Sequence, residues 1–250
     1  MAGEVFVDGR PVDKGGALFD DSCQIKIERR GGEFVSRGGV KLAAALERFE
    51  IDTRDRTAID AGASTGGFTD CLLQSGAKKV IAIDVGYGQF AWRLRQDNRV
   101  ELHERLNLRH LKPEMISESA SLAVVDVSFI SVLKILPSLI TCLRAGSEAL
   151  VLIKPQFEAG RADVGKGGIV KDPDTHRRVL STLVNRIAEL GPGLAGVTWS
   201  PIVGAKGNIE FWLYLKIPAQ ADSITDAEEL LSKIDETVAS AHQLLVGRDR

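Results

Sequence analysis

Two short segments near the start of the chain alternate apolar and polar residues, as β-strands with one exposed face do. They are residues 4–8 and 24–28. Glycines at positions 31, 32, 38 and 39 then interrupt any regular pattern and predict a linker over residues 31–39. From Gly39 onward the apolar residues are spaced as on one face of a helix. The chain therefore begins with a small strand-containing part that precedes a larger domain.

Beyond residue 50, strand-like apolar runs alternate with helical patterns, as is typical of an α/β protein with a parallel sheet. The predicted strands cover residues 57–60, 79–84, 100–103, 122–126, 149–153, 196–200 and 209–217. The clearest intervening helices cover residues 132–143 and 175–190. This order predicts a doubly wound sheet with helices packed against both of its faces.

The end of the chain is acidic. Residues 221–250 hold seven acidic and three basic residues. Thr225 and Glu228 have the spacing of a capping box, which predicts the start of an amphipathic helix. The patterns divide the chain into residues 1–30, the linker 31–39, a main domain 40–220 and an acidic C-terminal helix within 221–250.

Composition narrows the function classes. The 250 residues are 44% hydrophobic and 26% charged, with a formal net charge of −2, as in an ordinary globular domain. The net charge argues against indiscriminate nucleic-acid binding, although bases cluster near residues 29–41 and 161–178. We expect a cytoplasmic protein, because the chain has neither a secretory signal nor an apolar run of membrane-spanning length. The histidines and cysteines lack metal-ligand spacing, so no metal site is expected.

Residues 60–70 carry the strongest chemical signal, reading DAGASTGGFTD directly after a predicted strand. Glycine permits a sharp turn and the close approach of backbone to a ligand, which suits a nucleotide-like cofactor. A triphosphate is not expected, because no Gly-Lys-Ser/Thr follows. Gly66 and Gly67 could instead serve only tight packing. Asp84 ends the next strand, where an acid commonly binds the hydroxyl pair of a cofactor ribose, although it could simply start a turn.

Four charged residues lie where predicted elements begin or end. Lys41 is in the first helix of the main domain, Asp126 ends one strand, Lys154 follows another, and Glu210 enters the last. The carboxyl ends of parallel strands meet at one edge, so Asp126 and Lys154 are expected beside the glycine loop. Taken alone, Lys41 and Glu210 are also compatible with exposed surface residues.

Six motifs occur in one order with compatible spacing, and together they resemble the TlyA-type proteins. They are VSRGGVKL at 35–42, DAGASTGGFTD at 60–70, AIDVGYGQ at 82–89, VVDVSFIS at 124–131, LIKPQFEAGR at 152–161 and KGNIEFWLYL at 206–215. Members of this family are S-adenosylmethionine-dependent ribosomal RNA ribose 2′-O-methyltransferases, related to the FtsJ methyltransferases. The resemblance implies a Rossmann-like class I methyltransferase fold, with a mostly parallel seven-stranded sheet and helices on both faces.

The resemblance also assigns expected roles. The catalytic tetrad of the family falls on Lys41, Asp126, Lys154 and Glu210. Cofactor binding is expected at Asp60, Gly62, Ser64, Thr65, Gly66, Gly67, Asp84 and Asn107. The expected cofactor is S-adenosylmethionine and the expected partner is ribosomal RNA or a ribosomal subunit. Residues 3–27 resemble the end of the α-L RNA-binding module that precedes the catalytic domain in relatives.

The tetrad suits the chemistry that the resemblance implies. A ribose 2′-hydroxyl is a poor nucleophile, so its oxygen must be aligned with the methyl group and made more anionic. A lysine can accept the proton if neutral or stabilise the alkoxide if charged. We expect Lys154 in this role, Asp126 as the group that orients it, and Lys41 with Glu210 as positioning groups.

Three other functions fit parts of the sequence. A nicotinamide-dependent oxidoreductase would use the same glycine turn and Asp84, but the third glycine is misplaced for that fingerprint. A non-catalytic RNA-binding or ribosome-assembly factor could use a methyltransferase scaffold, although the complete tetrad argues against it. An older name for the family suggests a pore-forming haemolysin. This function is not expected, because the sequence shows neither a secretory signal nor a membrane-spanning segment. The target nucleotide and the oligomeric state are left open.

Overall fold

The computed structural model describes residues 5–12, 17–20, 22–27, 33–204, 206–218 and 227–245. The chain divides into two compact units, residues 1–33 and residues 34–250. The first unit is a small antiparallel sheet with the strand order β2-β1-β3. Its strands are β1 Val5–Val7, β2 Arg10–Pro11 and β3 Ile25–Ile27.

A tight turn builds the first hairpin of this unit. Asp8 and Gly9 both have positive φ, at 48° and 77°, between β1 and β2. Two consecutive left-handed residues are what a two-residue hairpin turn requires, and Asp-Gly is a favoured pair for it. The described residues of both predicted N-terminal strands are confirmed as strand or as its immediate flank, while residues 4 and 28 lie outside the described ranges. The resemblance of this unit to an RNA-binding module stays a prediction.

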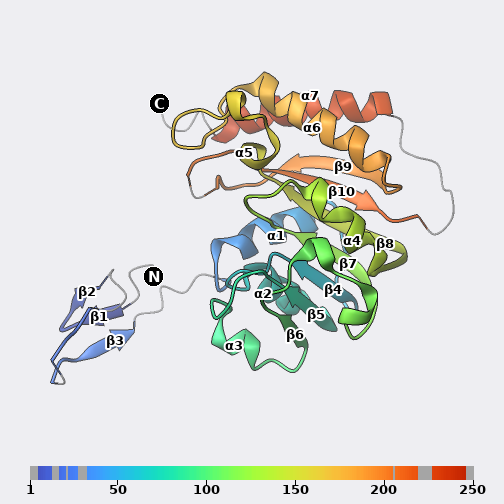
Figure 1. Cartoon of the computed structure of the whole chain (residues 1–250). Helices are drawn as coiled ribbons and strands as arrows, with labels where there is room; N and C mark the ends of the chain where they lie inside the picture. The colour runs from blue at the N-terminus through green and yellow to red at the C-terminus, as the bar shows by residue number, and fades with distance from the viewer. Residues whose placement is uncertain are drawn as a thin grey trace. The chain divides into compact units, whose positions relative to one another are not determined.

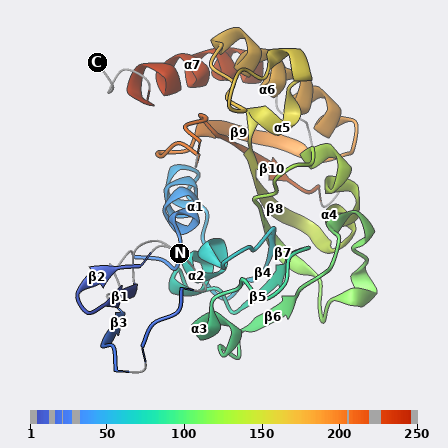
Figure 2. The ribbon, with the colours of Figure 1, turned by 60° about the vertical axis from the view of Figure 1, so that its left-hand side comes forward.

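The second unit is built on a seven-stranded sheet with the order β6-β5-β4-β7-β8-β10-β9 (Figures 1 and 2). Its strands are β4 Thr57–Ala61, β5 Lys79–Ile83, β6 Val100–His103, β7 Ala120–Val125, β8 Leu143–Ile153, β9 Gly193–Trp199 and β10 Phe211–Lys216. Neighbours from β6 to β8 are parallel, whereas β10 is antiparallel to both β8 and β9. The predicted α/β fold with a mostly parallel sheet is confirmed.

Helices cover both faces of this sheet (Figure 2). The α-helices are α1 Arg37–Arg48, α2 Gly67–Gln74, α3 Trp92–Arg95, α4 Leu136–Thr141, α5 Pro155–Glu158, α6 Pro173–Ala188 and α7 Ala227–Leu245. The described residues also contain the 3₁₀ turns η1 Leu108–His110, η2 Pro113–Met115, η3 Val132–Lys134 and η4 Arg161–Asp163. Among the described residues, no helix is both long and apolar enough to cross a membrane.

The sheet separates two hydrophobic cores because successive strand residues point to opposite faces. In β5, Val80 and Ala82 pack with α1 and α2, whereas Ile81 and Ile83 belong to the core beneath α4, α6 and α7. The acidic C-terminal helix joins this second core, since Ile234 of α7 is fully buried there. Thr225 of the predicted capping box lies outside the described residues, whereas the backbone of Glu228 belongs to α7.

Several elements differ in their bounds from the sequence prediction. The helix expected over residues 132–143 is split into η3 and α4, because Pro137 lacks an N–H and occupies the first turn of α4. The strand β8 begins at Leu143, six residues before its predicted start. Its first part contains the exposed residues Arg144, Ala145 and Gly146, whose polar or small side chains carry no strand-like apolar signal. The helix α1 also begins earlier than expected, at Arg37, with Ser36 as its N-cap.

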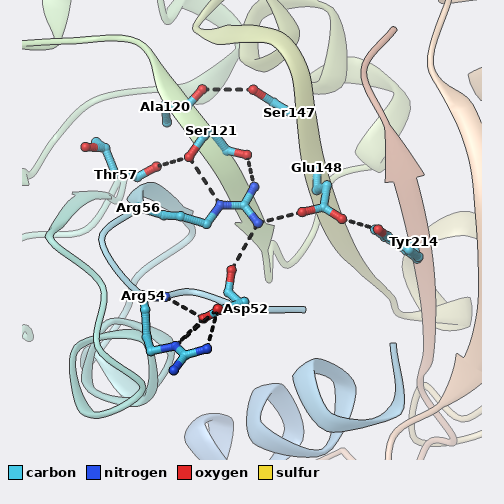
Figure 3. Close-up of polar contacts among 9 residues, drawn as sticks. All are labelled: Asp52, Arg54, Arg56, Thr57, Ala120, Ser121, Ser147, Glu148 and Tyr214. Carbon is cyan, nitrogen blue, oxygen red and sulfur yellow. Dashed lines mark hydrogen bonds and ion pairs between the residues drawn. The ribbon is translucent and has the colours of Figure 1, made fainter. Parts of the chain in front are cut away.

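Arg56 joins three strands at the amino ends of β4 and β7 (Figure 3). Its guanidinium donates to Ser121 Oγ and to the Ser121 carbonyl, and Nη1 lies 2.5 Å from Glu148 Oε2 in β8. Tyr214 of β10 donates its hydroxyl to the other oxygen of Glu148. Burial, followed by the hydrogen bond with Glu148, raises the pKa of Tyr214. Tyr214 therefore keeps its proton and remains a hydrogen-bond donor to Glu148.

Asp60 of β4 is a second buried polar group, and it fastens α2 to the sheet. Its side chain is fully buried and accepts a 2.7 Å hydrogen bond from Thr69 Oγ1. Burial raises the pKa of Asp60 to about 7, against a hydrogen bond from Thr69 that lowers it, and the charges of Asp126 and Asp84 raise it further. The carboxyl group thus sits in the core with a proton bound over much of the acidic range.

We predict that Arg56→Ala lowers the free energy of unfolding by about 2 kcal/mol, because it leaves a largely buried carboxylate without its partner. The matched control is Arg54→Ala, whose ion pair with Asp52 is mostly exposed, so a change of less than about 1 kcal/mol is expected. Urea unfolding of both variants measures the difference. Equal losses in the two variants would contradict the structural role of the Arg56 cluster.

Asp60 predicts a pH dependence of stability with a definite sign. Because its pKa is about 7 in the folded protein and 3.8 as the ordinary value, the folded state binds more protons between these values. Unfolding is therefore favoured as pH rises through this window, by about 4 kcal/mol at about 1.4 kcal/mol per pKa unit. Asp60→Asn should remove this fall, as urea unfolding between about pH 4 and about pH 8 can measure.

The surface variant Asp52→Asn controls for the loss of a carboxyl group. The hydrogen bonds from Arg54 lower the pKa of Asp52 from its ordinary value of 3.8 to about 2, so above about pH 5 Asp52 is ionised in both the folded and the unfolded state. Its removal should leave the slope of stability against pH unchanged between about pH 5 and about pH 8. A wild-type slope equal to that of Asp60→Asn would show that Asp60 does not titrate as described.

Candidate active site

The predicted tetrad converges at the carboxyl edge of the sheet. Asp126 follows β7, and its backbone N–H donates to the carbonyl of Ala61 at the end of β4, at 2.9 Å. Lys154 follows β8, and Glu210 immediately precedes β10. Because Phe211 pairs with Ile153 in the antiparallel β8–β10 ladder, Glu210 and Lys154 leave the ladder at the same end.

Two lysine–carboxylate pairs form at this edge. Lys41 Nζ of α1 lies 2.5 Å from Glu210 Oε2, and both side chains are buried. Lys154 Nζ lies 2.5 Å from Asp126 Oδ1 and donates a 2.8 Å hydrogen bond to Ser128 Oγ. The partners are far apart in sequence, so the fold alone brings them together. Buried charges of this kind are tolerated only when they are paired.

The two pairs also influence each other. Burial raises the pKa of Glu210, while the positive charge and hydrogen bond of Lys41 lower it. The charge of Asp126 raises the pKa of Glu210 further, and that of Lys154 lowers it. The other three groups of the tetrad therefore lie within electrostatic range of Glu210. The structure brings together the four residues that the sequence proposed.

A cavity of about 460 Å³ opens between the ends of β4, β5 and β7. Asp84 and Asn107 line it, together with the apolar side chains Val85, Val127 and Phe129. Asp84 is held in place by backbone N–H groups, since it accepts from Ser64 at 2.8 Å and from Gly86 at 2.6 Å. This combination of apolar walls with a few fixed polar groups is typical of a small-molecule site.

A smaller hollow of about 180 Å³ lies on the other side of the glycine loop. Ser36, Lys41, Thr65 and Val203 contribute to its lining. The cavity and the hollow share lining residues, which are Gly62, Ser64 and Asp126. Asp126 therefore stands where a group bound in one space could meet a group bound in the other.

The glycines of the loop have different roles. Gly62 has φ of 94°, and a Cβ there would collide with the backbone carbonyl of Asp126. Gly66 lines neither space described above, and a Cβ there would meet Leu94 and Phe90. Gly67 lines the smaller hollow and packs closely on Ser36. The structure shows a packing role for Gly66, and its predicted part in cofactor binding stays a prediction.

Asp60 is also not a lining residue of either space, because it is fully buried behind the loop and bonded to Thr69. Its burial does not support the direct cofactor contact expected from the sequence. Ser64, Thr65, Asp84 and Asn107 do line these spaces, as does Gly62. The Asn107 side chain accepts from the backbone N–H of Arg109 and so caps η1. The assignment of these residues to a cofactor stays a prediction.

Sequence reasoning overlooked Ser128 and Phe129. Ser128 accepts a hydrogen bond from Lys154, and Phe129, whose ring lies 4.9 Å from that of Phe157, has φ of 64° and is 90% exposed. A left-handed conformation is unusual for a bulky residue and is commonly retained at functional sites. Both residues lie in the VVDVSFIS motif, so their position beside Asp126 was the available signal.

Comparisons with known proteins identify the family of the chain. The family model described as FtsJ-like methyltransferase matches residues 34–217. The Bacillus subtilis protein YqxC, provisionally named an rRNA methyltransferase, is 45% identical over 98% of this chain and 87% of its own length. The Mycobacterium tuberculosis 16S/23S rRNA (cytidine-2′-O)-methyltransferase TlyA is 42% identical over 95% of this chain and 88% of its own length.

A solved structure supports the same relationship. It comes from Streptococcus thermophilus, is provisionally described as a hemolysin, and matches with a TM-score of 0.84 at 42% identity. The match covers 100% of this chain and 90% of that chain. With the family model covering most of the main unit and relatives aligned over nearly the whole length, the chain belongs to the FtsJ-like methyltransferase family.

Proposed function

We propose that this protein transfers a methyl group from S-adenosylmethionine to a ribose 2′-hydroxyl of ribosomal RNA. The convergence of the Lys41–Glu210 and Lys154–Asp126 pairs at the carboxyl edge is the observation that carries this proposal. The pairs adjoin two spaces that meet at Asp126. One space would hold the methyl donor and the other the acceptor nucleotide.

The larger cavity fits the proposed cofactor. Asp84 lies just after β5, at the position where α/β folds bind a ribose hydroxyl pair, and its orientation is set by backbone N–H groups. The apolar residues Val85 and Val127 offer surfaces for an adenine ring, with Asn107 as a polar contact. When bound, the cofactor would supply an electrophilic methyl group on a positively charged sulfur.

The acceptor side requires alignment and charge stabilisation. Lys154 would contact the 2′-oxygen, accepting its proton if neutral or stabilising its developing negative charge if protonated. Asp126 and Ser128 hold the Lys154 amine from two directions. The buried Lys41–Glu210 pair would position the ribose without itself taking the proton. With the cofactor bound, the bond between sulfur and the methyl carbon would break as the bond to the ribose oxygen forms, leaving a neutral thioether, and the ribose proton would go to a neutral Lys154 or to solvent.

Two considerations support ribosomal RNA as the substrate class. The Mycobacterium tuberculosis relative is named for cytidine 2′-O-methylation of 16S and 23S rRNA. The N-terminal strands resemble part of an RNA-binding module, and this unit would contribute to RNA affinity. An enzyme of ribosomal RNA works where ribosomes are assembled, so the proposal includes the expected cytoplasmic location.

We predict that Lys154→Ala reduces methyl transfer to unmodified ribosomal subunits by about 100-fold or more, the usual range for loss of a proton-transfer or charge-stabilising group. The assay follows labelled S-adenosylmethionine and locates the label on ribose or base. Lys112→Ala, an exposed lysine outside the site, should retain full activity. Label on a base would overturn the reaction type, and cofactor binding without transfer to any RNA would favour a non-catalytic assembly factor.

Asp84→Ala should weaken S-adenosylmethionine binding by about tenfold or more, because a charge-assisted hydrogen bond to the ribose is lost. Calorimetry with the purified protein measures the change directly. Lys154→Ala serves as the comparison, since it should leave cofactor affinity nearly unchanged. If Asp84→Ala bound the cofactor as tightly as the wild type, the proposed orientation in the cavity would be wrong.

A further inference from the structure

The segment between α5 and α6 is held in place by contacts within itself and with α6. Its sequence, with glycines at 160, 165, 167 and 168, suggests a mobile connector. In the structure, Gly165 and Ile169 form an antiparallel bridge, and Asp163 pairs with Arg178 of α6 at 2.8 Å. The basic side chains Arg161, Lys166 and Lys171 are exposed along the same segment. Among the described residues, these three form no ion pair.

Asn208 supplies the main connection between this segment and the active site. It is 1% exposed, and both ends of its amide are used. Its Oδ1 accepts from the backbone N–H of Val170 and its Nδ2 donates to the carbonyl of Gly168, each at 2.9 Å. Only an amide side chain of this length can donate and accept at once in this position.

The other side of Asn208 leads to the tetrad. Asn208 lies two residues before Glu210, and its own carbonyl accepts from the backbone N–H of Gly204 at 2.8 Å. Gly204 in turn packs against the Glu210 carboxylate so closely that a Cβ there would collide with Oε1. The segment carrying Lys166 and the strand entrance carrying Glu210 are therefore joined through one buried side chain.

We propose that Asn208 is a positioning residue for RNA: it fixes the 165–170 segment beside Glu210 so that Lys166 meets the RNA backbone near the acceptor ribose. This proposal rests on the proposed function and assigns a substrate-binding role within it. Exposed lysines bind phosphates through charge, but a free loop would have to be ordered at each encounter. Asn208 removes most of that ordering cost in advance.

The first test is the variant Asn208→Asp, which keeps the size and the acceptor for Val170 but places a carboxylate against the Gly168 carbonyl. Trypsin should cut the folded Asn208→Asp variant after Lys166 several-fold faster than it cuts the folded wild-type protein. The KM for unmodified ribosomal subunits should rise by about tenfold, the order expected when one or two buried hydrogen bonds are lost. The value of kcat and the affinity for S-adenosylmethionine should change less than about twofold, because the catalytic pairs are intact.

Two further variants sharpen the result. Asn185→Asp introduces the same chemical change on the exposed face of α6 and should alter neither proteolysis nor kinetics. Lys166→Ala should raise the KM without faster cleavage elsewhere in the segment. The double variant with Asn208→Asp and Lys166→Ala should have a KM little higher than that of either single variant, because both substitutions remove the same interaction between Lys166 and RNA.

Contrary results are equally specific. A fall in kcat with unchanged KM would mean that Asn208 acts through Glu210 alone, and unchanged proteolysis would mean that it does not hold the segment; either overturns the proposal. Additive losses in the double variant would also overturn it. If the wild type itself transferred no methyl group to RNA, the proposed function would fail, whereas the proteolysis result would still report on the segment.

Discussion

The desolvated ion pair between Lys41 and Glu210 is the interaction on which the site depends. Neither charge could remain in its buried position alone, because removing a lone ion from water costs several kcal/mol. Each partner therefore makes the other tolerable, and the pair connects α1 to the entrance of β10 across the carboxyl edge. The Lys154–Asp126 pair follows the same principle at the ends of two parallel strands. The contacts that we propose for catalysis therefore also act as structural links.

Much of this arrangement could be predicted, because strand order and strand polarity determine where a residue emerges. Asp126 and Lys154 follow apolar runs that are readable as buried strands, and the rule for parallel sheets places both at one edge. Lys41 and Glu210 could be recognised as site residues only through the family resemblance. The early start of β8 escaped prediction because its first residues are exposed, and strand periodicity requires a buried face.

Other features depend on contacts that no local pattern encodes. Asp60 lies in the motif that was expected to bind the cofactor. Its side chain is fully buried and bonded to Thr69, however, and it lines neither cavity. Gly66 resembles a ligand-binding glycine, but its lack of a side chain makes room for Leu94 and Phe90. The amide of Asn208 pairs with backbone about forty residues away in the sequence, as a long-range contact that spacing rules do not reach. In each case the tertiary neighbour decides the role.

The place of β10 in the sheet has a consequence for biosynthesis. The strand β10 is synthesised after β9 but lies between β8 and β9. The sheet therefore cannot be completed until the ribosome has synthesised almost the whole polypeptide. Until then Lys41 has no acidic counterpart from Glu210, and translation proceeds from the amino terminus. A prematurely terminated product ending before β10 would therefore lack both the strand that joins β9 to the rest of the sheet and the last tetrad member, Glu210. Half-finished copies of the enzyme would be inactive from the outset, rather than partly competent.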